Sequence, residues 1–176
     1  MPAFRSRALG PIGRMALRRG IMTCITVSSL RLEEAESLLA AGFLTGAGIV
    51  FSFAVEEFGK ALMLRDAFRG GVDPVVVEGF YDHDVKLRAA STLIPQEYLL
   101  ITAEAFHADA FDPAAFDIGT RTSFKARCDG LYVDWRDGEW QYGAEVDPSI
   151  LRDSINGVQA IVSQASAFWP EATSLP

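Results

Sequence analysis

The stretch FLTGAGIVFSFAVEEFGKALMLRDAF, residues 43–68, decides the fold of this chain. Its first half is apolar nearly all round and contains no proline, which predicts a helix at the centre of a helical bundle. Glycine suits the end of a helix, and Gly42 precedes the stretch while Gly70 and Gly71 follow it. The first charges stand at Glu56 and Glu57, so the second half of this helix must leave the core or meet a polar partner.

The same region raises the question of a membrane span. Residues 37–55 carry no charge and approach the length that crosses hydrocarbon, and Gly42 and Gly46 have the spacing of packed membrane helices. Against a span, acidic residues flank the run on both sides, at positions 33, 34 and 36 before it and 56 and 57 after it. We therefore expect a buried core helix in a soluble protein, with a membrane span as the alternative.

Outward from this stretch, helical periodicity predicts further helices. An amphipathic helix should run from Ser28 or Ser29 to Ala41. A third helix should start at Asp73-Pro74 and end near Leu93, and the last should start at Asp147-Pro148 and end before Pro170. A fourth helix is expected over residues 96–111.

Residues 131–142 change to an alternating pattern, which predicts a β-hairpin that turns at Arg136-Asp137-Gly138. The expected fold class is therefore mainly α, a helical bundle with a β-hairpin insertion before the C-terminal helix. Residues 22–170 should form a single domain. Residues 1–21 are basic and lack a sustained apolar run, so we expect a disordered arm there, with Met15 and Met22 as alternative starts.

Composition limits the classes of function. The chain has 176 residues, 49% of them hydrophobic, and a net charge of −7, which argues against broad electrostatic binding to nucleic acid. Cys24 and Cys128 are far apart and stand in no metal or redox spacing, which favours a reducing compartment. We expect no metal and no cofactor.

A charged cluster interrupts the apolar helix at Glu56, Glu57 and Lys60. Such a cluster is expensive to bury unless it is paired, and Glu56 and Lys60 stand one turn apart. One interpretation is a solvated patch where the helix leaves the core. The other is a polar site closed by the third helix, into which Glu57 and Lys60 point.

The third helix offers matching residues. Phe80, His83, Lys86 and Leu87 follow three- and four-residue spacings, so His83 and Lys86 share one face. A lone histidine on a helix is more often a packing residue, and Lys86 could pair with Asp82. Together with a carboxylate, however, His83 could carry protons and the lysines could stabilise phosphate charge.

Other candidates carry weaker signals. His107 lies among acidic residues in a spacing that matches no trusted metal motif. Tyr132 could stack on a base, although aromatic residues in a hairpin more often pack across the strands. Lys125 and Arg127, just before the hairpin, add a local basic region that could bind RNA.

Three segments together resemble the AbiV family of prokaryotic abortive-infection proteins: AGIVFSFAVEEFGKALML (47–64), FYDHDVKL (80–87) and GLYVDWRDGEW (130–140). The matching positions are Glu56, Glu57 and Lys60, then Phe80, His83 and Lys86, then 131–134, and the resemblance covers about residues 28–165. It implies a phage-defence role in a prokaryotic cytoplasm and a fold similar to the helical HEPN superfamily, which includes RNA-cleaving toxins.

The chain departs from the HEPN ribonuclease pattern, which has an arginine a few residues before the catalytic histidine. Neither His83 nor His107 has an arginine at that distance. A metal-independent ribonuclease would therefore use a variant site, with Glu57, Lys60, His83 and Lys86 as candidate catalytic residues and Glu56 as a candidate binding residue. The alternative is a noncatalytic helical module that binds a protein partner. The resemblance also implies a homodimer, and a phage-derived protein could be the trigger.

Overall fold

The computed structural model describes residues 8–99, 134–136, 139–141 and 147–172. Most of these residues are helical, which confirms the expected mainly α fold with a β-hairpin before the C-terminal helix. The helices are α1 (Arg14–Ala40), α2 (Leu44–Arg69), α3 (His83–Ala90), α4 (Gln96–Leu99) and α7 (Pro148–Ala172). The strands are β1 (Leu9–Ile12), β2 (Val75–Val77), β3 (Asp134–Arg136) and β4 (Glu139–Gln141).

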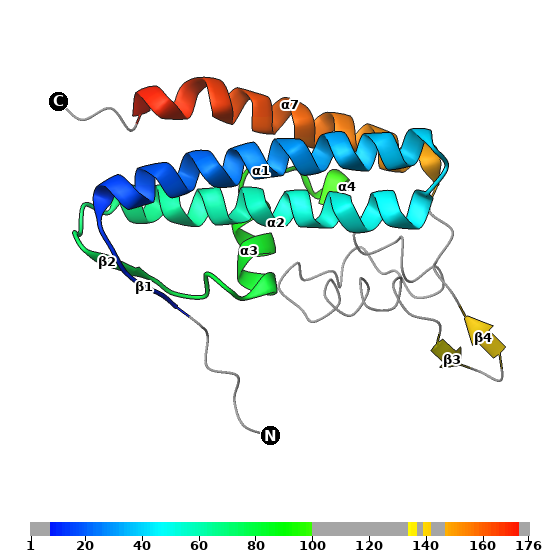
Figure 1. The fold of residues 1–176 in the computed structure, drawn as a ribbon, viewed down its shortest axis with the longest axis horizontal. Helices are drawn as coiled ribbons and strands as arrows, with labels where there is room; N and C mark the ends of the chain where they lie inside the picture. Colours follow the sequence, from blue (N-terminus) through cyan, green and yellow to red (C-terminus); the bar gives the residue numbers. More distant parts are fainter. Residues whose placement is uncertain (1–7, 100–133, 137–138, 142–146, 173–176) are drawn as a thin grey trace.

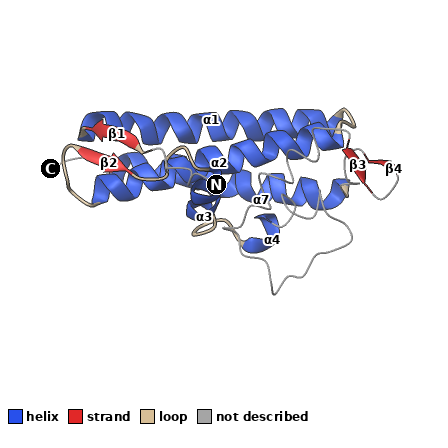
Figure 2. Ribbon diagram, turned by 90° about the horizontal axis from the view of Figure 1, so that it is seen from below, coloured by secondary structure: helices blue, strands red, loops and turns tan. Residues whose placement is uncertain are grey.

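The helices α1 and α2 form an antiparallel hairpin, and α7 packs along it (Figure 1). Gly42 allows the tight turn between α1 and α2 because its φ of 82° lies in the left-handed region that glycine adopts without strain. The turn is closed by Phe43, whose N–H donates to the carbonyl of Leu38 at 2.9 Å. Figure 2 shows the same three long helices side by side, with α3 against the middle of α2.

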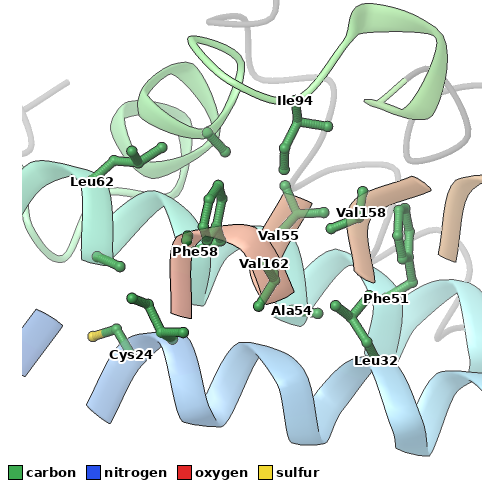
Figure 3. Close-up of a cluster of buried hydrophobic side chains, with 14 of the residues drawn as sticks. Cys24, Leu32, Phe51, Ala54, Val55, Phe58, Leu62, Ile94, Val158 and Val162 are labelled. Atoms are coloured by element: carbon green, nitrogen blue, oxygen red, sulfur yellow. The ribbon is translucent and has the colours of Figure 1, made fainter. Parts of the chain in front are cut away.

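The hydrophobic core lies between these three helices and the segment that follows α3. Figure 3 shows Phe58 and Val55 of α2 next to Val162 of α7, with Ile94 approaching from the segment after α3. Burying these side chains removes apolar surface from water, which is the main stabilising contribution in such a bundle. The largest fully buried side chains come from every long helix: Phe51, Phe58, Leu17, Ile21, Ile25, Leu32, Leu62, Leu64, Ile94, Leu151, Val55 and Val158.

The N-terminal segment corrects one expectation. Residues 8–21, which we expected to be a disordered arm, form β1 and the first turns of α1, and Leu17 and Ile21 are buried in the core. They continue the stripe of buried residues that Cys24 and Ile25 carry further along α1. The arginines hid this stripe in the sequence because they occupy the positions between its apolar members. Residues 1–7 lie outside the described residues.

The segment after α2 corrects a second expectation. Asp73-Pro74 does not start a helix: Val75–Val77 form β2, which pairs antiparallel with β1 and sets Val77 opposite Leu9. Three consecutive β-branched residues favour an extended chain, and β1 supplies the partner strand. The Asp73 carboxylate accepts a hydrogen bond from the backbone N–H of Arg14 at 3.2 Å, so it caps α1 instead of its own segment.

The hairpin and the last helix follow the expectation closely. β3 and β4 are antiparallel, with Trp135 opposite Trp140. Asp147 caps α7 through the N–H and hydroxyl of Ser149, and these hydrogen bonds lower the pKa of its carboxyl. The helix α7 ends at Ala172, two residues beyond Pro170, whereas it was expected to end before Pro170. Of the expected fourth helix, α4 covers Gln96–Leu99, and the remainder lies outside the described residues.

Within the described ranges, no helix is both long enough and apolar enough to cross a membrane. The uncharged run that suggested a span is divided between α1 and α2 by the turn at Gly42.

Candidate functional site

The candidate site is built where α3 rests on α2. Gly59 of α2 makes this contact possible, since a Cβ atom at that position would lie only 2.0 Å from the backbone carbonyl oxygen of Lys86. Any other residue would push α3 away from α2. Glu56 precedes Gly59 by three positions on α2. The close approach places His83 and Lys86, which stand one turn apart on α3, over Glu56.

Glu56 is the centre of the site. Its side chain is 5% exposed, and Oε2 lies 2.7 Å from Nδ1 of His83 and 2.8 Å from Nζ of Lys86. Lys86 is equally buried, whereas the side chain of His83 is 41% exposed. A buried carboxylate is stable only when it is paired, and Lys86 provides the compensating charge. The arrangement therefore holds a partly exposed imidazole against a covered ion pair.

The pair of Glu57 and Lys60 forms a second, more exposed layer. Nζ of Lys60 donates to Oε1 of Glu57 at 2.6 Å, and the side chains of Lys60 and Glu57 are 22% and 24% exposed. The Lys60 ammonium also lies 5.9 Å from the centre of the Phe80 ring, within the range of a cation–π contact. We call Glu57 and Lys60 the rim of the candidate site.

The pairing differs from the one expected from the sequence. We expected Glu57 to orient His83, and the carboxylate that contacts the ring is that of Glu56. We also expected Glu56 to pair with Lys60, whereas Lys60 pairs with Glu57 and Lys86 pairs with Glu56. The physical reason is the close approach at Gly59, which brings the ammonium of Lys86 onto Glu56.

The start of α3 fixes the position of His83. Asp82 is the N-cap residue, and its Oδ1 accepts hydrogen bonds from the N–H groups of Asp84 and Val85 at 2.9 and 3.3 Å. Asp82 is therefore engaged in capping and does not pair with Lys86 as expected. His83 is the first residue of the helix, so the cap directly limits the freedom of its backbone.

A buried thiol lies behind the rim. The pKa of Cys24 is raised to about 11, mainly by burial and in smaller part by the negative charge of Glu57, while Lys60 acts in the opposite direction. At neutral pH the thiol is therefore protonated, and a protonated thiol is a poor nucleophile. Cys24 is part of the hydrophobic core.

The other candidate residues, Lys125, Arg127, Tyr132 and His107, lie outside the described residues. Among the residues that are described, no group of three or more His, Cys, Asp or Glu side chains could hold a metal ion.

Two features of the site escaped the sequence analysis, namely the central position of Glu56 and the contact at Gly59. A signal for both was present, because Ser52, Glu56 and Gly59 follow one another at four- and three-residue spacings on one face of α2. Small residues on such a face permit another helix to come close. The carboxylate between them is then the one that this helix covers.

The arrangement can carry out proton transfer. An imidazole held by a carboxylate and still open to solvent is a common general acid or base. Lys60, at the rim, is placed where it could contact an anionic group of a ligand.

Comparison with known proteins gives one match. The model of the family HEPN_AbiV, described as AbiV, matches residues 16–163. No curated protein and no solved structure matches the chain. The matched range includes α1 from residue 16 onward and all of α2 and α3, and therefore all the residues of the candidate site that the structure describes.

Proposed function

The chain belongs to the AbiV family of HEPN-like abortive-infection proteins, and from this premise we propose that it limits phage infection by acting on RNA or on the translation apparatus through His83. The family itself implies the anti-phage role. The proposal adds the chemistry, and one observation carries it: a partly exposed imidazole lies 2.7 Å from a buried carboxylate.

RNA cleavage without a metal needs proton transfer. A base removes the proton of a 2′-hydroxyl as its oxygen attacks the neighbouring phosphorus, and an acid returns a proton to the 5′-oxygen that leaves. Histidine is the side chain that most often carries protons in this way near neutral pH. His83 is the candidate for one of these transfers because its ring is accessible.

The lysines have different proposed roles. Lys60 stands at the rim and can shift from Glu57 to a phosphate group, so we assign it the stabilisation of phosphate charge. Glu57 orients Lys60. Lys86 is buried and paired with Glu56, so its role in this proposal is to compensate the charge of that carboxylate and hold it beside His83.

A phage-infection assay with His83→Asn tests the proposal. Asparagine places its amide nitrogen near the position of Nδ1 and can still donate to Glu56, but it cannot carry a proton. We expect protection to be lost while the circular dichroism spectrum and melting temperature stay close to those of the parent. Arg88→Ala, which removes an exposed charge from the same helix, is the control and should protect fully. Full protection by a folded His83→Asn protein would reject the proposal.

A second measurement addresses RNA directly. We expect the purified protein to cleave RNA in the presence of a metal chelator, and the His83→Asn variant to lose this activity. Cleavage that survives in the variant would show that another site or a contaminant is responsible.

The alternative function is that of a noncatalytic module that binds a protein partner. The observation in its favour is the pairing of the charges: Glu56 and Lys86 form a buried ion pair, and Glu57 and Lys60 form a second pair on α2. Under this alternative, protection against phage should vary in step with melting temperature across variants of Glu56, Glu57, Lys60 and His83. Protection that varies independently of melting temperature contradicts it.

We further propose that the protein is a cytoplasmic homodimer. HEPN-like bundles commonly pair, and the small residues Gly46 and Gly48 of α2 allow close helix approach. We expect the chain in the supernatant of a detergent-free lysate, with the mass of a dimer in solution. A monomer at micromolar concentration, or recovery only in membranes, would contradict the corresponding part of the proposal.

A further inference from the structure

We infer that Glu56 and Lys86 together hold His83 in the tautomer that carries its hydrogen on Nδ1. Nε2 is then the ring nitrogen that exchanges a proton with the substrate, a consequence that rests on the proposed function. Glu56 is a positioning residue in this scheme, since it acts through His83.

The contact between Glu56 and His83 determines where the hydrogen lies. A carboxylate oxygen has no hydrogen and can only accept, so the 2.7 Å distance from Oε2 to Nδ1 requires a hydrogen on Nδ1. A neutral imidazole carries one hydrogen. The other nitrogen, Nε2, is then the basic one.

The position of Lys86 is compatible with this assignment, because its ammonium can donate to Glu56 instead of to Nδ1. The ammonium group donates three hydrogens and has no lone pair to accept one, so it cannot form a hydrogen bond with an N–H group. Nζ of Lys86 lies 3.3 Å from Nδ1 and 2.8 Å from Oε2 of Glu56. The two donors therefore share one acceptor oxygen, and the 3.3 Å distance follows from that sharing.

The charge of Lys86 also keeps Glu56 an acceptor. Both side chains are 5% exposed, and a buried charge is stable only when it is paired. The backbone of Lys86 is fixed on α2 by the contact at Gly59, so the ammonium has little room to move away. Of the two acidic residues that flank His83 in the chain, Asp82 is engaged in capping α3.

The same geometry predicts the result of removing the pair. Without Glu56 and Lys86, Nδ1 loses the carboxylate that accepts its hydrogen, so both tautomers should be populated. Replacing a buried ion pair by apolar residues of similar size is often neutral for stability, so Glu56→Met with Lys86→Met should fold.

Nitrogen NMR of the histidine ring tests the inference independently of any activity. In a His107→Gln background His83 is the only histidine. The couplings between the two ring nitrogens and the hydrogens bonded to the ring carbons identify the tautomer. We expect the Nδ1–H pattern in this parent and in the control Glu57→Gln, and loss of that single pattern in the double methionine variant. Circular dichroism checks that each variant is folded.

Two outcomes would overturn the inference: an Nε2–H pattern in the parent, or an unchanged Nδ1–H pattern in the folded double variant. If the double variant does not fold, the parent spectrum alone decides. The two proposals can fail separately. If the parent shows the Nδ1–H pattern but the His83→Asn variant still protects cells, the tautomer assignment holds and the proposed function is rejected.

Discussion

Glu56 and Glu57 are neighbours in the chain, yet their carboxylates have different surroundings. Successive residues on an α-helix point about 100° apart, so α3 covers one of the two and leaves the other at the rim. Glu56 meets His83 and Lys86, while Glu57 meets Lys60. The chemistry of the site thus depends on which of two identical side chains lies beneath α3.

Gly59 is the residue that sets this arrangement, and Gly59→Ala should destabilise the protein. The added Cβ would fall 2.0 Å from the carbonyl oxygen of Lys86, a backbone atom that cannot yield without moving α3. We expect a loss of about 1–3 kcal/mol in the free energy of unfolding, as for other overpacked sites, measured by urea denaturation.

The matched control is Gly46→Ala on the same helix. There the nearest neighbour of an added Cβ is a side-chain atom of Leu38 at 3.7 Å, an ordinary contact. Alanine also favours the helix by up to about 1 kcal/mol relative to glycine. Equal effects at the two positions would show that the contact with Lys86 is not the cause.

Cys24 provides a pH-dependent prediction at the residue scale. Its pKa rises from 9.0 to about 11 on folding, so the folded state holds the thiol proton more tightly than the unfolded state does. The resulting stabilisation is complete below pH 9.0 and is lost as the pH rises toward 11. We therefore expect the parent to lose more stability than Cys24→Ala over this interval, in denaturation curves recorded at each pH. A parallel loss in both proteins would contradict the assignment.

At the scale of elements, α1 depends on residues that look in the sequence like a basic arm. Leu17 is fully buried, so Leu17→Ala should lower the free energy of unfolding by about 2–5 kcal/mol. Met15 is two residues away on the same helix and 65% exposed, so Met15→Ala should change it by less than about 0.5 kcal/mol. Thermal and chemical denaturation measure both. A stable protein lacking residues 1–21 would show that this part of α1 is dispensable.

The element α3 shows how a local signal can be displaced along the chain. Asp73-Pro74 and Asp82 both have the features of a helix start, and only Asp82 caps its own helix. The valines after Pro74 pair with β1, and the carboxylate of Asp73 serves α1. A cap therefore marks a helix start only where the following residues have no better partner.

At the scale of the whole molecule, α1, α2 and α7 share one core, so they should unfold together. Trp169 of α7 stacks on Phe58 of α2 with ring centres 5.7 Å apart, which makes its fluorescence a probe of this packing. With Trp135 and Trp140 replaced by phenylalanine, the loss of Trp169 fluorescence and of helical circular dichroism should have the same urea midpoint. Separate midpoints would show that α7 leaves the bundle before α1 and α2 unfold.

The sequence by itself determined the helical bundle, the span of α2, the start of α7 and the hairpin. Each rests on a local signal, such as the apolar run of α2 or the alternation around Trp135 and Trp140, that no distant contact overrides. The sequence also indicated the two segments that carry the site. It could not show that residues 8–21 belong to the fold, because their apolar residues can be recognised as one buried face only when α1 is packed against α2.

Tertiary structure alone decided the pairing within the site. Periodicity places Glu56, Glu57, Lys60, His83 and Lys86 on their helices, but it does not set the distance or rotation between α2 and α3. That geometry follows from the missing side chain at Gly59, which lets the backbone of Lys86 rest on α2. Because an ion pair depends on distances of a few ångströms between elements far apart in the chain, the assignment of Glu56 to His83 required the packed structure.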